Sequence, residues 1–493
     1  MLSSFYFFDL VFYRVFIDID YFYINSHHNL SQYKIQQYKM KLHLHQQLVH
    51  HAVLINSTAA CMYYAKKRFK KVKKKVPSSR TGCPTRPRTR KSVKAVFNEL
   101  GRKAFRRAYR MHLESFYDLY KKIKKQLWIE CKYDTERKYA PNGRIHPTVR
   151  LACALRMVAG GEAVDIACTY GLSKTEVHDS FDYVIAAVNS HPDLKIEFPS
   201  SHEEQHKIAE GFHKKSKADI KSCVGCIDGM LVWMFQPTKA ECKRAGVDSG
   251  KFFCGRKHKF GVNFQAVCDS KKRFLNISIL FPASCSDFIA FEATPFRAML
   301  EQPGFLARGL CLFGDNAYVN RFYMATPYSN VGENTQKDIY NFFHSQLRIN
   351  IECAFGILVA RWGILRKALS SNFTVAKIVS MVECLCRLHN FIIDMETEPD
   401  TPAEASVQDN LNMILDGAIS VDNRVIQRGD GTDTVAYSTP SDVMHGGEHF
   451  DDVDFVTRNR TIACRAPNET LPRELIFAHV SEQDLRRPKA RSY

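Results

Sequence analysis

The stretch that decides the fold is CVGCIDGMLVWMF, residues 223–235, which holds a single acidic residue, Asp228. Apolar residues on both sides of Asp228 predict a buried strand, because a strand covered on both faces is a nearly continuous apolar run. A bare carboxylate is costly to bury, so Asp228 has to be protonated, paired with an arginine or lysine, or bound to a metal ion. The stretch by itself leaves these three alternatives open.

Strand and helix patterns alternate in the residues that follow, up to about residue 394. Further strands are predicted at residues 259–268, 274–281 and 310–314. Helices are predicted at residues 287–300, 341–366 and 375–393. This order predicts a mixed α/β domain over residues 222–394, with acidic residues at the ends of strands.

A helical region is predicted before this domain. Residues 92–126 carry apolar side chains at steps of three to five, and residues 148–189 form a compact helical stretch. Within it, a helix at 164–170, a turn at Gly171, and a helix capped by Ser173 with Glu176 three residues later resemble a helix-turn-helix. The second helix of that motif lies in the DNA major groove, although helical hairpins with glycine turns also occur in plain bundles. We therefore predict a helix-turn-helix-like DNA-binding region at 92–191, with a bundle that only packs as the alternative.

The basic charge of the chain is concentrated near its N-terminus. The formal net charge is +19, and residues 66–110 hold 19 Lys and Arg against one acid, Glu99. Such a block favours a polyanion, and runs like KKRFKKVKKK serve as nuclear import signals or phosphate contacts, with a solvated linker as the alternative. We predict a nuclear protein. The predicted DNA contacts are Lys66, Lys67, Arg68, Lys70, Lys71, Arg106, Arg107, Arg256, Lys257 and Lys259.

The remaining segments complete the predicted organisation of the 493 residues. Residues 1–65 are predicted to be a poorly ordered leader, 66–91 a basic tail, 192–221 a polar connection, and 395–493 a mostly disordered acidic tail with a short helix or strand near 471–480. The 16 cysteines are spread along the chain, which indicates reduced thiols inside a cell. No apolar run approaches the roughly 18 residues of a membrane span, so no membrane partner is expected.

Three acidic residues stand out in the α/β region: Asp228, Asp315 in LCLFGDNAY at the end of the fourth strand, and Glu352 in the periodic helix RINIECAFGILVARWGIL. Carboxylates brought together from two strands and a helix repel each other unless divalent cations lie between them, and such hard oxygen ligands suit Mg²⁺ or Mn²⁺. Two such ions about 4 Å apart can activate a water and stabilise the leaving oxygen in phosphodiester cleavage. The alternative is that Arg348, one turn before Glu352, pairs with it on the helix surface.

Several long blocks of sequence resemble the PIF/Harbinger type of DDE transposase, the Harbinger transposase-derived nuclease family. They are IDGM around Asp228, KFFCGRKHKFGVNFQAVCD at 251–269, Ser286 with Asp287, GDNAY at Asp315, NFFHSQLRINIECAFGILVARWGILRK at 341–367, and LCRLHNFIID at 385–394. The upstream stretches AFRRAYRMHLESFYDLY and RIHPTVRLACALRMVAGG also resemble this family, so the likeness covers about residues 102–394. Cys285 departs from it, because the family has a small hydroxyl residue or glycine there.

The resemblance implies an RNase H-like catalytic domain in which Asp228, Asp315 and Glu352 are catalytic and bind two divalent ions. It implies a DNA transposase that cuts the terminal repeats of a transposon, after which the freed 3′-hydroxyl attacks an A/T-rich target. It further implies a homo-oligomer on DNA and a Myb-like partner protein. A domesticated DNA-binding or adaptor protein without strand transfer, and a nuclease without strand transfer, are the alternatives.

Overall fold

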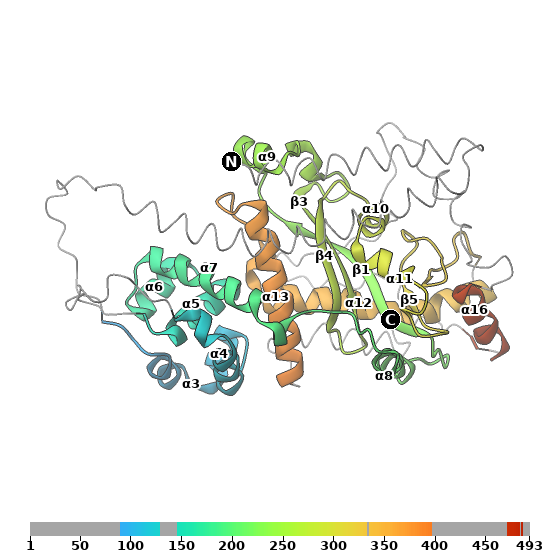
Figure 1. The fold of residues 1–493 in the computed structure, drawn as a ribbon, viewed down its shortest axis with the longest axis horizontal. Coiled ribbons are helices and arrows are strands. Elements are labelled where there is room, and N and C mark those ends of the chain that lie inside the picture. Colours follow the sequence, from blue (N-terminus) through green and yellow to red (C-terminus); the bar gives the residue numbers. More distant parts are fainter. Residues whose placement is uncertain (1–88, 129–144, 333–334, 397–470, 484, 487–493) are drawn as a thin grey trace, which may run out of the picture.

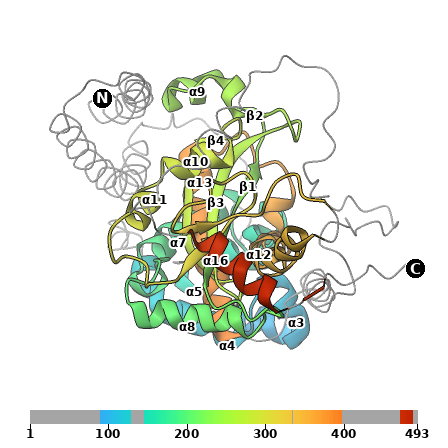
Figure 2. The ribbon, with the colours of Figure 1, turned by 90° about the vertical axis from the view of Figure 1, so that its right-hand side faces the viewer.

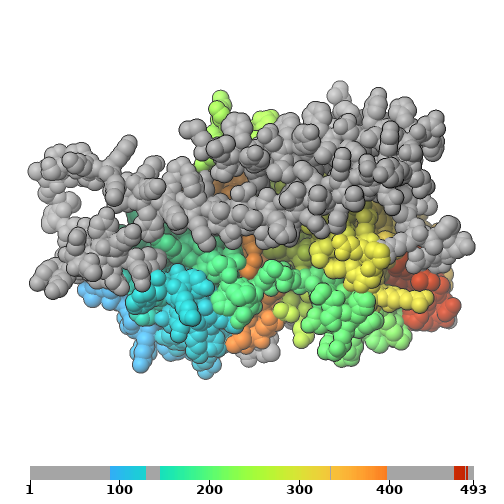
Figure 3. Space-filling model, viewed as in Figure 1, coloured from blue at the N-terminus to red at the C-terminus, as the bar shows by residue number. Residues whose placement is uncertain are grey.

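The computed structural model describes residues 89–128, 145–332, 335–396, 471–483 and 485–486. The predicted leader, nearly all of the predicted basic tail, and most of the predicted acidic tail lie outside the described residues. Figure 1 shows a helical region at one end of the described chain and a sheet with helices on both faces at the other. The same two ends can be followed on the surface in Figure 3.

Five helices form the N-terminal region. They are α3 (Val93–Tyr109), α4 (Leu113–Leu127), α5 (Pro147–Val158), α6 (Ala163–Tyr170) and α7 (Lys174–Ser190). The side chain of Ser92 caps α3, and α3 ends where Arg110 adopts a left-handed conformation with φ of 64°. The predicted helical stretches are confirmed, with this break between α3 and α4 added.

The turn between α6 and α7 has the predicted form. Gly171 ends α6 with φ of 63°, and Ser173 and Glu176 make both hydrogen bonds of a capping box at the start of α7. A side chain at position 171 would overlap the carbonyl oxygen of Thr89, because the preceding chain crosses this turn. Helix α7 packs against α5 and α13 (Val375–Met395), and its exposed residues are Lys174, Thr175 and Ser190. Because α7 has so little exposed surface, the structure favours the alternative in which this helical hairpin only packs in a bundle and does not enter the DNA major groove.

The predicted polar connection at 192–221 contains a helix that the sequence pattern missed. After the short 3-10 turn η1 (Pro192–Leu194), helix α8 (His202–His213) packs against the first strand of the sheet. Its buried residues are Gln205, Ala209 and Phe212. Because one of these three is polar, the apolar period is too weak to mark a helix.

The sheet has the strand order β2-β3-β1-β5-β6, and β4 also pairs with β3. Its strands are β1 (Cys223–Trp233), β2 (Phe253–Cys254), β3 (Lys259–Cys268), β4 (Phe274–Pro282), β5 (Cys311–Phe313) and β6 (Met324–Ala325). The neighbours β1, β3 and β4 run antiparallel, and β5 lies parallel to β1. The four predicted strands are confirmed, whereas the two-residue strands β2 and β6 are too short to leave a periodic signal.

Helices cover both faces of the sheet, and each face has its own apolar core. Helix α12 (Gln336–Arg361), the 3-10 turn η3 (Gly363–Arg366) and α13 belong to one side; α8, α10 (Asp287–Glu292) and α11 (Pro295–Leu300) belong to the other. The helix predicted at 287–300 is two helices, because Thr294 caps a new one that begins at Pro295. A small helix, α9 (Lys239–Ala245), and the turn η2 (Ser249–Phe252) follow β1 and were not predicted. The mixed α/β prediction is confirmed, and the arrangement is consistent with an RNase H-like domain.

A last helix, α16 (Pro472–Glu482), returns to the α/β domain from the C-terminal part of the chain. It packs on α12 and β6, and Figure 2 shows it lying across this end of the domain. Ile476 and Val480 are buried in the core, and the ring of Phe477 lies 5.5 Å from that of Tyr328. The segment predicted as a short helix or strand is therefore a helix.

Candidate active site

Asp228, in the middle of β1, and Asp315, just after the end of β5, both follow the point where the parallel pairing of these two strands ends. Cys226 of β1 is paired with Phe313 of β5, and each aspartate follows two residues further along. Gly314, between Phe313 and Asp315, leaves no room for a side chain because a Cβ there would lie 2.9 Å from Tyr318. Strand pairing thus explains why these two carboxylates converge.

Glu352 reaches the same place from α12, which packs on β1. Its Oε1 lies 2.6 Å from Nη2 of Arg348, one turn earlier on the helix. The predicted surface pairing of Arg348 with Glu352 is therefore present, but it is incomplete. Nη1 of Arg348 also donates to Oδ2 of Asp228 at 3.4 Å, and the Arg348 side chain is only 15% exposed. Arg348 bridges the strand and the helix instead of lying on the surface.

The electrostatics of the site follow from burial. Burial raises the pKa of Asp228 well above its usual value, and the Asp315 carboxylate raises it further, while Arg348 opposes the shift. Burial also raises the pKa of Asp315, with Arg348 and the N–H of Ala317 opposing. Burial lowers the pKa of Arg348, but the three carboxylates around it outweigh this and raise that pKa. Of the three alternatives for Asp228, two are therefore supported: its raised pKa favours protonation, and Arg348 is an arginine partner.

A fourth acid, Asp287, was not predicted as a site residue although the sequence marked its position. Its Oδ1 accepts hydrogen bonds from Nδ2 of Asn263 at 3.0 Å and Nε2 of Gln265 at 2.7 Å. The Tyr318 hydroxyl donates to Oε1 of Gln265 at 2.6 Å. A side chain at Gly229 would overlap Asp287, so this glycine lets the acid approach β1 beside Asp228. The sequence did contain a signal for this acid's partners. Asn263 and Gln265 are two residues apart on the mostly apolar strand β3, so their side-chain amides lie on the same face of the sheet.

The predicted basic residues between the first two strands have different surroundings. Arg256 is exposed in the turn that joins β2 and β3. Burial lowers the pKa of Lys257, and Arg256 lowers it further, while Asp287 and Asp228 oppose the shift. Lys257 therefore lies close to the acids. The ammonium of Lys259 lies 4.2 Å from the centre of the Trp233 ring, so part of its surface is covered.

The other predicted DNA contacts are less informative. Arg107 is exposed on α3, whereas Nε of Arg106 lies 3.4 Å from the buried carboxylate of Glu396. Arg106 is thus occupied by an internal ion pair. The predicted contacts at positions 66–71 lie outside the described residues.

The donor set of Asp228, Asp315 and Glu352 has the chemistry that a hard divalent cation requires, because all three are carboxylates and the two partly buried aspartates interact with each other. Within the described ranges, however, no three His, Cys, Asp or Glu side chains are already arranged to hold a metal ion. Arg348 lies between Asp228 and Glu352 and contacts both, which keeps these two carboxylates apart. The donors fit such an ion in kind, and Arg348 separates them.

Residues 227–390 match the family described as DDE superfamily endonuclease. The matched range holds all three predicted acids. This confirms the predicted resemblance to DDE transposases of the Harbinger type at the level of the domain.

The chain is also similar to Protein ALP1-like of Arabidopsis thaliana, with 24% identity over 279 residues, which is 53% of this chain and 64% of the relative. The chain therefore spans less than two thirds of the length of the curated relative it matches. No solved structure matches the chain significantly. No helix in the part of the chain that the structure describes is long and apolar enough to cross a membrane.

Proposed function

We propose that this protein is a transposase-derived DNA nuclease in which Asp228, Asp315 and Glu352 are the catalytic carboxylates. The observation that carries the proposal is that these three acids converge on the buried Arg348 from β1, the end of β5 and α12, inside the segment that matches the endonuclease family. Three elements that are far apart in the sequence thus place their acids around one arginine. A structural ion pair needs two charges only, so the extra buried carboxylate favours a functional site.

Two Mg²⁺ or Mn²⁺ ions held by the trio would supply the positive charge that activates a water and stabilises the leaving oxygen of a phosphodiester. The chain's own residues fix the acids for this task. The N–H of Gly229 donates to Oδ1 of Asp228 at 2.7 Å, and the N–H of Ala317 donates to Oδ1 of Asp315 at 2.9 Å. In both aspartates a backbone N–H therefore fixes Oδ1 and leaves Oδ2 for another partner.

The finer part of the proposal is transposition. We infer that the enzyme cuts transposon terminal repeats in the nucleus and joins the 3′-hydroxyl to an A/T-rich target, as a homo-oligomer and with a Myb-like partner. Lys257 and Arg256 at the mouth of the site, together with the basic residues at 66–71, Arg107 and Lys259, would contact DNA phosphates. Arg106 is left out of this set because it pairs with Glu396. The helical region at 92–191 would support the DNA around the cut.

The test is DNA cleavage by the full chain with single substitutions D228N, D315N and E352Q, each of which keeps the size of the side chain. We expect supercoiled plasmid to be nicked by the wild type in Mg²⁺ or Mn²⁺, and each variant to lose nicking. The matched control is E383Q, because Glu383 pairs with Arg387 one turn along α13 at 2.5 Å, away from the site. Nicking that persists in all three variants and in E383Q alike would exclude this trio.

Strand transfer is tested separately, with duplexes that carry terminal inverted repeats as DNA ends. A joined product from the wild type and none from D228N supports a transposase. Nicks without joined product support a nuclease alone.

A second candidate function is a domesticated DNA-binding or adaptor protein. The observation that favours it is Arg348, which already neutralises part of the charge on Asp228 and Glu352, so the fold does not depend on a metal. This candidate predicts that D228N leaves every cellular role unchanged. The nicking assay separates the two functions.

A further inference from the structure

A polar hollow lies beside the loop that follows Asp315. Its volume is about 240 Å³, its open mouth included, and it is lined by Asn316, Tyr318, Asn320, Thr326, Pro327, Ser329 and Arg473. Most of this lining comes from the chain between β5 and α12, but Arg473 comes from α16. Two segments far apart in the sequence therefore form one hollow next to a proposed catalytic residue.

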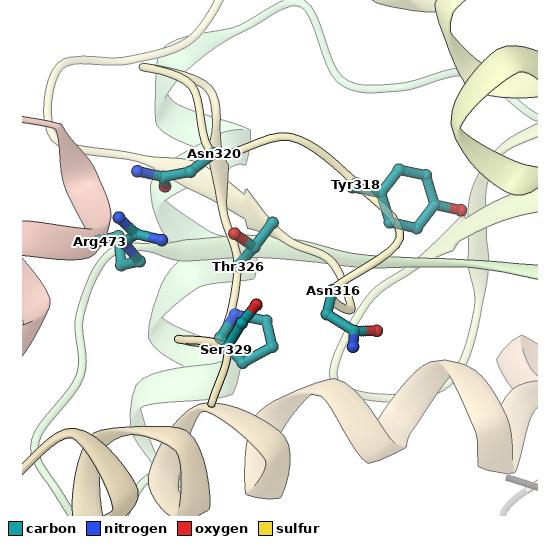
Figure 4. A pocket seen from close by; sticks show the side chains of 7 residues that line it. Asn316, Tyr318, Asn320, Thr326, Ser329 and Arg473 are labelled. Atoms are coloured by element: carbon teal, nitrogen blue, oxygen red, sulfur yellow. The ribbon is translucent and has the colours of Figure 1, made fainter. Parts of the chain in front are cut away.

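The amide of Asn320 points to a missing partner in this hollow. Its side chain is only 3% exposed, yet neither its nitrogen nor its oxygen has a hydrogen-bond partner among the described residues. Leaving a buried amide unpaired costs about 1–3 kcal/mol, so a ligand or a bound water is expected there. Figure 4 shows this amide beside the Arg473 guanidinium, while the Tyr318 ring points away.

The charge of the lining selects the kind of ligand. It contains one cation, Arg473, and no acidic residue. Glu474, the next residue, contacts Arg473 at Nε and Nη2 at 2.9 Å, on one side of the guanidinium. The planar group carries five N–H donors, and Glu474 and the Tyr328 side chain take only part of them, so donors remain for another acceptor. A guanidinium, an amide N–H₂ and hydroxyl groups together are donors for a phosphate oxygen.

Arg473 is held in place by its surroundings. Its guanidinium lies 4.3 Å from the centre of the Tyr328 ring, and the Tyr328 hydroxyl donates to Oε2 of Glu474 at 2.5 Å. Arg473 occupies the first turn of α16, whose own start has no side-chain cap. The helix packs on the core through Ile476 and Val480. A guanidinium fixed in this way binds an anion without a large loss of side-chain entropy.

We propose that this hollow binds a phosphate group through Arg473 and Asn320, and that the group is a phosphodiester of the DNA strand leaving the acid site. The choice of DNA as its source rests on the proposed function, because Asn316 in the lining directly follows Asp315. Free inorganic phosphate has the same chemistry and is the other source. In this reading α16 is the part of the C-terminal chain that completes the DNA surface.

The test uses the full chain and two variants that act on the hollow in different ways. R473M removes the guanidinium but keeps an aliphatic side chain against Tyr328, and N320D places a carboxylate beside Arg473, where the anion would lie, without changing a residue of α16. The matched control is K337M, because Lys337 also lies over the Tyr328 ring, at 5.0 Å, but does not line the hollow. The melting temperature of each variant reports whether it folds.

The first arm measures binding of a labelled DNA duplex from about 50 to about 200 mM salt. Losing one phosphate contact makes the slope of log K against log salt shallower by about 0.9, and we expect this change in R473M and N320D but not in K337M. The second arm measures the rise in melting temperature that inorganic phosphate causes. A rise in the wild type that both variants lose, with unchanged DNA slopes, assigns the hollow to free phosphate.

Wild-type behaviour of both variants in both arms overturns the proposal, since a bound water would then satisfy Asn320. An effect of R473M without any effect of N320D also overturns it, because α16 would then act by packing alone. If the wild type binds no DNA, the proposed function fails. The phosphate arm still decides the hollow in that case.

Discussion

Replacing Arg348 by methionine removes a buried guanidinium but keeps most of the aliphatic bulk of the side chain. In the wild type this group donates to Asp228 at 3.4 Å and contacts Glu352 at 2.6 Å. The substitution leaves three acids facing one another without it. We expect the variant to fold with a lower free energy of unfolding, because Asp228 keeps its burial and loses its partner.

The expected size of the loss follows from the two contacts. Glu352 is 44% exposed, so its pair with Arg348 is screened by water and contributes only about 0.2–1 kcal/mol. Asp228 is 18% exposed and Arg348 15% exposed, and removing one partner of a buried pair costs roughly 3–5 kcal/mol. A total of about 3–6 kcal/mol corresponds to a fall in melting temperature of about 6–24 °C in a domain of this size.

The loss depends on pH, and its sign can be worked out. Burial raises the pKa values of Asp228 and Asp315 in the folded protein, whereas the unfolded value is about 3.9. An acid with a raised folded pKa contributes stability that is fully present below the unfolded pKa and is lost as pH rises through the folded pKa. Without Arg348 these pKa values rise further. The difference in stability between R348M and the wild type should therefore shrink as pH falls from 7 toward 4.

Urea unfolding of both proteins over that pH range measures the effect. The matched control is R387M, since Arg387 is 10% exposed and pairs with Glu383 at 2.5 Å on α13, far from the acid cluster. We expect the R387M loss to change little with pH. We also expect Mg²⁺ to raise the melting temperature of R348M more than that of the wild type. The reasoning is refuted if R348M and R387M show the same pH dependence.

Two further predictions concern the hydrogen bonds around Asp287, which include Gln265 and Tyr318. G229A should cost about 1–3 kcal/mol in urea unfolding, because its methyl group would overlap Asp287, whereas G255A, with no atom within 4 Å of a Cβ, should be neutral. An equal effect of the two substitutions would contradict this. Y318F should lower the free energy of unfolding by about 1–3 kcal/mol, because Gln265 loses a buried donor at 2.6 Å. An unchanged unfolding midpoint for Y318F would mean that water replaces the hydroxyl.

The elements with long apolar patterns could be predicted from sequence. The nearly continuous apolar run of β1 and the alternation along β3 mark buried strands, and the capping box at Ser173 marks a helix start. Strands β2 and β6 span two residues each, which is below any period. Strands β2 and β6 form because the neighbouring strands β3 and β5 pair with them, and a local sequence pattern contains no information about such pairing.

The acids of the site could be selected from sequence, but their surroundings could not. Asp228 in a strand, Asp315 at a strand end and Glu352 in a helix stood out in the sequence, but the resemblance to Harbinger transposases was needed to assign them as a trio. The spacing of Arg348 predicted only a pair on one helix. Its second contact, to Asp228, joins residues 120 positions apart. The same limit hid the hollow at Asn320, whose lining includes Arg473.

Arg348 also bears on whether the site can accept a cation. One guanidinium stands against three carboxylates, so the cluster stays negatively charged when all of them are ionised. Burial is the main reason why the pKa of Asp228 is raised, and the neighbouring Asp315 carboxylate raises it further despite Arg348. A site evolved for stability alone would balance its charges or replace them with apolar side chains. This site keeps a surplus of partly buried acid within the segment that matches the endonuclease family, and that surplus supports the proposed binding of divalent cations.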